Sequence, residues 1–363
     1  MNPPSTPAKV RQYPCKGCGA NVEFSPGTDA LKCPFCGHLD AIPQSKEQIK
    51  EYSLKDALVL TRKSKGFGIP GRDVKCERCA AVSHITGETL SADCAWCGAA
   101  LTVPQEVQES DTIAPEAVLP FAVDKGASTK LFRDWVASRW FAPGTLKSMA
   151  SLAKIQGVYR PFWTYDAQTT SHYEGDRGDH YYETEHYTAT ENGKSVRKTR
   201  QVRKTRWSHH WGTFDEFFDD VLIPAGGHND WNSTYRLEAL KPYEASYLPG
   251  FVAERYTVPV DEGWKRAREE IDGELHSIAC RKIGGDEQRN VEVSTAYRGV
   301  SFKHILLPLW VASYMYGQKV YRFQVNGQTG EVTGQRPYSF WKIFLFILTI
   351  AAIAAGIAIL SQQ

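Results

Sequence analysis

Two matched sets of Cys-x-x-Cys motifs constrain the fold of this 363-residue chain more than any other feature. In each set fourteen residues separate the two motifs, and the second set repeats the first 61 positions later. Zn²⁺ takes four soft ligands in a tetrahedron, and a two-residue gap lets both thiolates of a tight turn reach one ion. We therefore predict two structural Zn²⁺ ions in two zinc ribbons, bound by Cys15, Cys18, Cys33, Cys36, Cys76, Cys79, Cys94 and Cys97.

The residues around the cysteines indicate a duplicated module. Gly37 aligns with Gly98, and we expect backbone amides around Gly17, Gly19 and Gly37 to bond the sulfurs. So small a unit has almost no hydrophobic core, so metal binding should stabilise most of its fold. Reduced or redox-active cysteines without metal are the alternative, and they suit a single motif better than two matched sets.

Three further residues could take part in metal or thiol chemistry. His38 and His84 lie near the motifs, and we expect both on the surface of the zinc knuckles. The ninth cysteine, Cys280, is expected to be a small buried residue of a helix. Nine thiols without an N-terminal apolar segment favour a reducing cytosol over a secreted disulfide scaffold.

The charge balance gives no indication of a nucleic-acid partner. Forty-three Lys and Arg residues against 41 Asp and Glu residues give +2, and eight thiolates (−8) with two Zn²⁺ (+4) change this to −2.

The C-terminal tail predicts a single transmembrane helix. Residues 343–360 contain no charge and no proline, and at about 1.5 Å per residue they span about 27 Å, close to the bilayer hydrocarbon core. Arg336 and Lys342 place positive charge on one side only, which predicts a cytoplasmic-membrane protein with its N-terminal bulk in the cytoplasm. A buried C-terminal helix is the alternative. Small-x-x-x-small pairs suggest a homo-oligomer through this helix: Ala351/Ala355, Ala352/Gly356 and Ala354/Ala358.

The predicted class is α+β, with an antiparallel-sheet-rich domain between the ribbons and the tail. Residues 119–124 and 257–261 each precede an amphipathic stretch and a later strand (158–163 and 305–310), which predicts two α/β repeats. Hairpin turns are expected at Asn192-Gly193 and Asn326-Gly327. The predicted divisions are zinc ribbon 1 (1–44), a helical spacer (45–70), zinc ribbon 2 (71–104), an acidic linker (105–117), the α+β domain (118–337) and the transmembrane anchor (338–363).

One basic segment is a candidate site for an anionic ligand. It contains no acidic residue between its first and last members: Lys194, Arg197, Lys198, Arg200, Arg203, Lys204 and Arg206. In a strand, every second residue shares a face, which could track nucleic-acid phosphates beside the tryptophans at 207 and 211. The alternatives are a solvated hairpin balanced by acids downstream at 215, 216, 219 and 220, or a surface facing anionic lipid headgroups.

The sequence contains no recognisable catalytic motif. The segment from Asn192 to Ser195 imitates the end of a phosphate-binding loop but lacks its first glycine, since Thr188 stands there. Neither a Gly-x-Ser-x-Gly elbow nor a His-Glu-x-x-His helix occurs. We therefore predict that the protein is not an enzyme.

The chain resembles a bacterial family in four features: the double ribbons, the Pro-Phe-Trp and Pro-Leu-Trp strands, Phe218-Asp-Asp-Val-Leu222, and the glycine-containing hairpin before the membrane helix. Its members are membrane-anchored zinc-ribbon proteins, often labelled primosomal protein N′ (replication factor Y) or superfamily II helicase. Helicase activity is not implied, because the chain lacks a nucleotide-binding loop. Some relatives are encoded beside flotillin-like (SPFH) and phage-shock proteins, so the resemblance implies recruitment of such a protein to the membrane.

These observations favour a non-enzymatic, zinc-binding adaptor that is anchored in the bilayer and recruits a protein partner. The alternative is a membrane-tethered nucleic-acid-binding protein that uses the ribbons and the basic segment.

Overall fold

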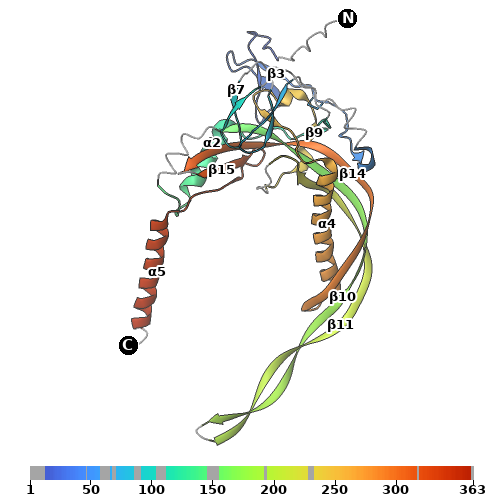
Figure 1. Cartoon of the computed structure of the whole chain (residues 1–363), viewed down its shortest axis with the longest axis vertical. Helices are drawn as coiled ribbons and strands as arrows, with labels where there is room; N and C mark the ends of the chain where they lie inside the picture. Colours follow the sequence, from blue (N-terminus) through green and yellow to red (C-terminus); the bar gives the residue numbers. More distant parts are fainter. Residues whose placement is uncertain are drawn as a thin grey trace.

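The computed structural model describes residues 13–45, 47–57, 66–67, 71–85, 91–103, 112–144, 155–191, 194–227, 233–316 and 319–360. These stretches form a curved, sheet-rich body from which a two-stranded arm and a C-terminal helix project (Figure 1). The α+β class is therefore confirmed.

Three long strands form the frame of the body: β10 (Gln156–Glu191), β11 (Lys194–Pro224) and β14 (Glu287–Tyr316). β10 pairs antiparallel with β11 on one side and with β14 on the other. The stretches 158–167 of β10 and 302–312 of β14 are buried throughout. Both are rich in Val, Leu, Ile and aromatic residues, as expected for strands covered on both faces.

Shorter elements complete the body around these strands. Two of the short pairs, β13 with β10 and β9 with β14, are parallel, and the other pairs are antiparallel, in agreement with the predicted antiparallel-rich sheet. Within the described residues the full sheet has eleven strands, the others being β4 (Tyr52–Ser53), β5 (Arg72–Lys75), β6 (Val82–Ile85), β9 (Ala117–Val118), β12 (Lys241–Pro242), β13 (Val252–Glu254), β15 (Lys319–Asn326) and β16 (Val332–Gly334). Two 3-10 turns precede β12 and β13, respectively: η2 (Leu237–Ala239) and η3 (Ala245–Tyr247).

Helix α4 (Val260–Ile283) packs on one face of the long strands, against Ala167 and Phe214. Gly263 permits the close approach, because a Cβ atom there would lie 2.3 Å from Tyr165 Oη. That hydroxyl donates to the Val260 carbonyl at 2.6 Å and holds the start of the helix. The buried face repeats every four residues, as the sequence pattern predicts: Ala267, Ile271, Leu275 and Ala279.

Helix α2 (Lys125–Ala137) begins at Asp124, whose carboxylate accepts a hydrogen bond from the Ala127 amide at 2.8 Å. It buries Phe132 and Val136 beside β15. The predicted amphipathic stretch extends to Trp140, but the helix ends earlier. Trp140 lies beyond the helix and is 74% exposed.

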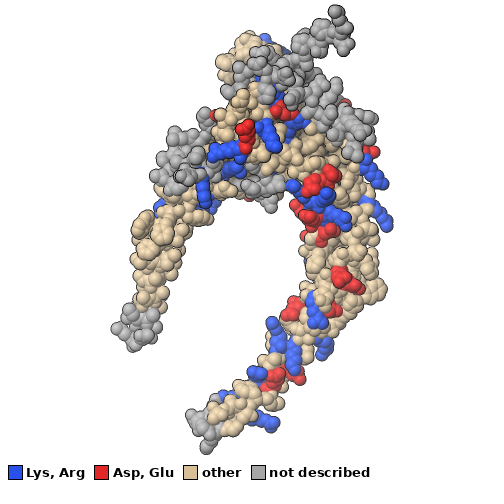
Figure 2. All heavy atoms as spheres, in the orientation of Figure 1, with Lys and Arg blue, Asp and Glu red and all other residues tan. Residues whose placement is uncertain are grey.

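Helix α5 (Phe340–Leu360) is the predicted apolar C-terminal helix, and it projects away from the body (Figure 1). Its segment Phe340–Ile357 has a mean hydropathy of 2.2, and none of that segment is buried in the protein. Figure 2 shows almost no charge along it. The helix is therefore long and apolar enough to cross a membrane.

The segment predicted as a helical spacer begins as part of the body. β4 pairs with β14, and Ser53 Oγ caps η1 (Leu54–Asp56) by accepting from the Lys55 amide. The rest of the expected helices, at 58–65, lies outside the described residues. The predicted acidic linker likewise ends inside the core, since Ile113 and Ala117 are buried.

The predicted repeats correspond to two helices, α2 and α4, each followed by a long strand. The internal repeat itself stays a prediction. The hairpin at Asn326-Gly327 is confirmed, because β15 and β16 pair across it. Asn192-Gly193 lies outside the described residues, and β10 and β11 pair up to Glu191 opposite Lys194.

Ribbon 1 has its own sheet, formed by β1 (Glu23–Phe24), β2 (Ala30–Lys32) and β3 (Leu39–Ala41). It is not a free module, however. Phe24 is 3% exposed, and its ring packs on Tyr247 and Phe251 of the body, with centroid distances of 5.2 and 6.2 Å. Ribbon 1 therefore shares a hydrophobic core with the body.

Ribbon 2 is joined to the body more closely still. Its β6 pairs with β13, and its cysteines pack against Val158, Leu309 and Val311 of the long strands. The hairpin of β7 (Ser91–Asp93) and β8 (Ala100–Thr102) completes the ribbon. The prediction of two almost coreless modules is wrong, because each ribbon completes its core with residues distant in the sequence.

Beyond the pair Gly178–Glu287, β10 and β11 continue without β14 as a two-stranded arm, residues 179–191 and 194–206. Thirteen residues per strand at about 3.3 Å each give a length of about 43 Å. The arm and α5 project from the same side of the body (Figure 1).

Candidate metal centres and basic arm

The four Cys-x-x-Cys motifs fold into the same turn. In each turn, the amide of the first cysteine donates to the carbonyl of the residue five positions later. The amide of the residue four positions later donates back to the carbonyl of that cysteine. These hydrogen bonds measure 2.7–3.0 Å. The residue that donates back has a positive φ in all four turns: Gly19, Gly37, Ala80 and Gly98. The duplication seen in the sequence is therefore a duplication of backbone geometry.

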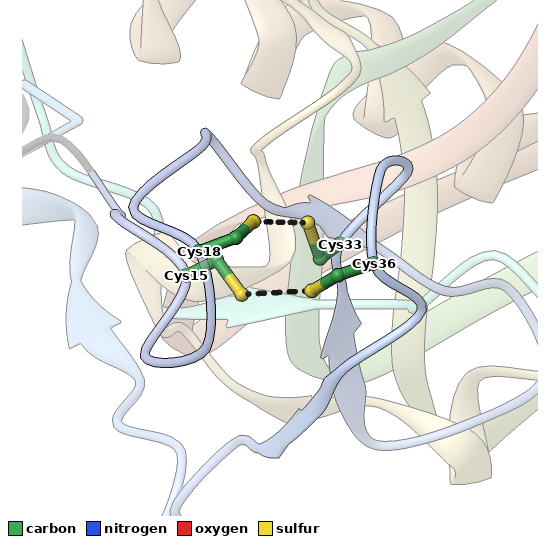
Figure 3. A group of neighbouring side chains, drawn as sticks. All are labelled: Cys15, Cys18, Cys33 and Cys36. Atoms are coloured by element: carbon green, nitrogen blue, oxygen red, sulfur yellow. Dashed lines mark hydrogen bonds between the residues drawn. The ribbon is translucent and has the colours of Figure 1, made fainter.

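These turns bring four sulfur atoms together in each ribbon. In ribbon 1 the Sγ atoms of Cys15 and Cys36, and of Cys18 and Cys33, are 3.5 Å apart (Figure 3). The corresponding distances in ribbon 2 are 3.5 and 3.6 Å, and within each cluster all four sulfurs lie within 4.8 Å of one another. Tetrahedral Zn²⁺ with Zn–S bonds of about 2.3 Å needs sulfur separations of about 3.8 Å. Both clusters are therefore compatible with one zinc ion each.

The electrostatics of the thiols also fit a cation. The Cys36 backbone amide lowers the pKa of Cys33 to about 6, whereas burial raises the pKa of Cys94 to about 11. Four thiolates crowded together repel one another, so a divalent cation is needed to hold all four ionised. Gly17 donates its amide to Cys15 Sγ at 3.3 Å, as predicted. The amides of Gly19 and Gly37 themselves bond carbonyl oxygens, but the next amides, of Ala20 and His38, bond the sulfurs of Cys18 and Cys36, as expected of amides around these glycines.

The two clusters differ in exposure. In ribbon 1, Cys18 and Cys36 are exposed to solvent, whereas in ribbon 2 three cysteines are buried and Cys79 is half-buried. The ring of Trp96 is also buried in ribbon 2, with the Arg160 guanidinium 5.3 Å above it. Ribbon 2 is thus enclosed by the body, and ribbon 1 keeps one side open.

The histidines near the clusters behave differently from each other. His38 is partly exposed on the ribbon 1 surface, as predicted. His84 is 9% exposed, and its Nδ1 lies 2.8 Å from Asp73, which also pairs with Arg255. The prediction of a surface position for His84 is therefore wrong. Cys280 lies on α4 as expected but is only half-buried, 3.7 Å from His276 Nδ1.

The predicted basic segment forms the β11 strand of the arm, opposite an acidic stretch of β10. Arg200 pairs with Glu185 at 3.0 Å, and Lys204 pairs with Glu183 at 2.5 Å. Of the alternatives considered for this segment, the hairpin is therefore observed, but the acids that pair with it lie on the paired strand and not at 215–220. Asp215 accepts instead from Thr170.

Two arginines of the arm form no ion pair with a described carboxylate. Arg197 and Arg203 are exposed on the face opposite to that of Lys198, Arg200, Lys204 and Arg206, and no carboxylate pairs with either among the described residues. Arg206 stacks on Tyr181 with its guanidinium 5.3 Å from the ring centroid. The side chain of Lys194 is not described.

The Trp/His cluster at 207–211 lies on β11 directly after the arm, where β14 also pairs with β10. The Arg289 guanidinium lies 4.0 Å from the ring centroid of Trp207, and His209 lies 3.6 Å from Asp176. Trp211 is 68% exposed on β11. Trp207 and His209 therefore have partners on the neighbouring strands.

Sequence reasoning missed a groove beside ribbon 1. It has a volume of about 810 Å³, and Phe24, Phe251 and Trp310 contribute apolar surface to it. Glu23 and Lys32 of ribbon 1 supply charge at its side. The groove joins segments more than 200 residues apart, so no local sequence signal marks it.

The fold and the clusters define a protein with two four-cysteine centres, compatible with two zinc ions, and one helix able to span a membrane. Over 359 residues the chain is 28% identical to the uncharacterized protein YdjG of Bacillus subtilis (strain 168), an alignment that covers 94% of each chain. No family model and no solved structure matches the chain. The similarity to YdjG thus extends over nearly the whole chain.

Proposed function

We propose that the protein is a non-enzymatic, zinc-binding adaptor that holds a protein partner at the cytoplasmic face of a membrane. The observation that carries this proposal is the 18-residue apolar segment Phe340–Ile357 of α5, none of whose residues is buried in the protein. Exposing so much apolar surface to water is unfavourable, and a bilayer removes that cost. The cytoplasmic orientation follows from Arg336 and Lys342 on the N-terminal side of the helix.

The closed metal clusters support a scaffold role. Four cysteine ligands leave a zinc ion no open position for water or substrate, so the ions would fix the ribbons in place. The groove beside ribbon 1 is the docking site we propose for the partner, because it combines apolar surface with charged neighbours. The family resemblance noted from the sequence implies a partner of the flotillin-like or phage-shock type.

Affinity purification from detergent-solubilised native membranes tests the adaptor. The full-length protein should retain a specific partner, and the double variant Glu23→Lys, Lys32→Glu should lose it while keeping two zinc ions. Reversing Glu269 and Arg268 on α4, away from the groove, provides the matched control. If the groove variant and a Cys18→Ser, Cys36→Ser variant both keep every partner, the adaptor proposal fails.

The arm supports a second candidate, binding of nucleic acid without helicase activity. The specific observation is the exposed pair Arg197 and Arg203, which lack carboxylate partners among the described residues. Changing both to Gln should weaken RNA or DNA binding and reduce its salt dependence, whereas Arg200→Gln, which removes an already paired arginine, should have a smaller effect. Gel shifts at low salt measure both, and the absence of any shift for the unmodified protein would exclude this function.

A further inference from the structure

The segment 138–144, which follows α2, lies against the beginning of α5, and we call it the Trp140 loop. The Ser339 amide donates to the Phe141 carbonyl at 2.8 Å. Lys342 Nζ donates to the carbonyls of Trp140 and Ala142 at 3.0 and 2.7 Å. Three backbone carbonyls of the loop are thus used to hold the start of the apolar helix.

Aromatic rings continue this contact along α5. The Phe346 ring lies 5.3 Å from Phe141 and 6.4 Å from Trp140, measured between ring centroids. Phe346 is six residues into the helix, which corresponds to about 9 Å along its axis. If Phe340–Ile357 crosses the bilayer, a side chain touching Phe346 lies below the level at which the helix enters.

The loop presents apolar surface that the protein does not cover. Trp140 is 74% exposed, and Phe340 and Trp341 at the start of α5 are 72% and 70% exposed. Tyr338 adds a fourth exposed ring just before the helix. Tryptophan and tyrosine favour the boundary between headgroups and acyl chains, where the ring is apolar and its polar atom stays hydrated.

We propose that the Trp140 loop is a second membrane contact, which inserts Trp140 and Phe141 into the interfacial layer of the leaflet where α5 enters. This inference rests on the proposed membrane anchor and deepens it by placing one end of α2 on the phospholipid surface. The contact with Ser339 precedes the helix, so the loop stays beside the point of insertion at any tilt that α5 takes.

The loop also explains how Lys342 is accommodated within the apolar segment. An ammonium group near hydrocarbon needs acceptors for its protons, and a lysine can extend its side chain toward the headgroups to find them. Here two carbonyls of the Trp140 loop provide acceptors directly. The loop and the lysine therefore stabilise each other at the membrane boundary.

Photolabelling of the full-length protein in phospholipid nanodiscs tests the proposal. The nanodiscs would contain a small fraction of phospholipid with a diazirine on the acyl chain, and labelled residues would be located by mass spectrometry. We expect label on α5 and on Trp140 or Phe141. Phe35, which is 80% exposed in ribbon 1, across the body from α5 (Figure 1), is the matched control for an exposed aromatic residue and should stay unlabelled.

The outcomes separate this inference from the proposed anchor. Label on α5 without label on the loop would overturn the inference and leave the anchor intact. An unlabelled α5 would refute the anchor, and the inference with it. Equal labelling of Phe35 and Trp140 would also overturn the inference, because exposure alone would then explain the result.

Fluorescence gives a second, independent measurement. In nanodiscs made with phospholipids brominated on the acyl chain, Trp140→Ser should remove part of the quenchable tryptophan emission, whereas Phe35→Ser, which removes no tryptophan, should leave that emission unchanged. Two bound zinc ions in each variant would show that the ribbons remain folded. An unchanged quenchable emission in Trp140→Ser would contradict the insertion of this side chain.

Discussion

The attachment of ribbon 1 to the body depends on Phe24, and replacing this residue with alanine tests the shared core. Phe24 is 3% exposed and packs between Tyr247 and Phe251. Truncating a buried phenylalanine costs about 3–5 kcal/mol, from lost apolar burial and the cavity left behind. With a urea dependence of about 1–3 kcal/mol per M, the midpoint for release of ribbon 1 should fall by at least about 1 M.

The assay is zinc release from the full-length protein in detergent, followed with a chromophoric chelator at increasing urea. Phe35→Ala is the matched control, since Phe35 lies in the same ribbon but is 80% exposed. Both variants keep the eight cysteines of the two clusters, so both should bind two zinc ions without urea. A midpoint for Phe24→Ala within experimental error of Phe35→Ala would refute the shared core and restore ribbon 1 as an independent module.

Three further predictions concern the metal clusters and a buried acid. Gly37 has a φ of +74° and nothing within 4 Å of an added Cβ, so Gly37→Ala should cost about 1 kcal/mol through backbone strain alone, and Ala80→Gly at the equivalent position should be neutral or stabilising in thermal melts. Cys36→Ser and Cys94→Ser should each lower the zinc content from two to one, but only Cys94→Ser should increase proteolysis of the body, because ribbon 2 packs on β10 and β14. Burial raises the pKa of Glu254 from 4.5 to about 7, so the folded state holds this proton more tightly than the unfolded chain. The free energy of unfolding should therefore fall by about 3 kcal/mol as pH rises from 4.5 through about 7. Denaturation at pH 5 and pH 8 should show that Glu254→Gln lacks this loss.

The features that the sequence predicts well are those with local causes. Cysteine spacing determines which sulfurs can meet, and an uninterrupted apolar run predicts α5 whatever surrounds it. The four-residue repeat of α4 likewise reflects packing against a single face. The ribbon cores could not be predicted in this way, because Phe24 meets Tyr247 only after the whole body has folded.

The acids that balance the basic segment were, by contrast, within reach of sequence reasoning. A two-residue Asn-Gly turn pairs residue 191 with residue 194. The antiparallel register that follows places Glu185 opposite Arg200. The alternation of Glu183 and Glu185 on β10 was the missing signal. In a hairpin the balancing charges lie across the strand pair and not further along the chain.

The packing of the ribbon 2 cysteines against Val158, Leu309 and Val311 links metal supply to the completion of the whole molecule. A chain made when zinc is scarce would expose these strand residues, although its C-terminal helix would still be apolar enough to insert. Folding of the body would then require zinc, and chains without zinc would reach the membrane incompletely folded and be degraded by proteases. Cellular abundance of the protein should accordingly follow zinc availability.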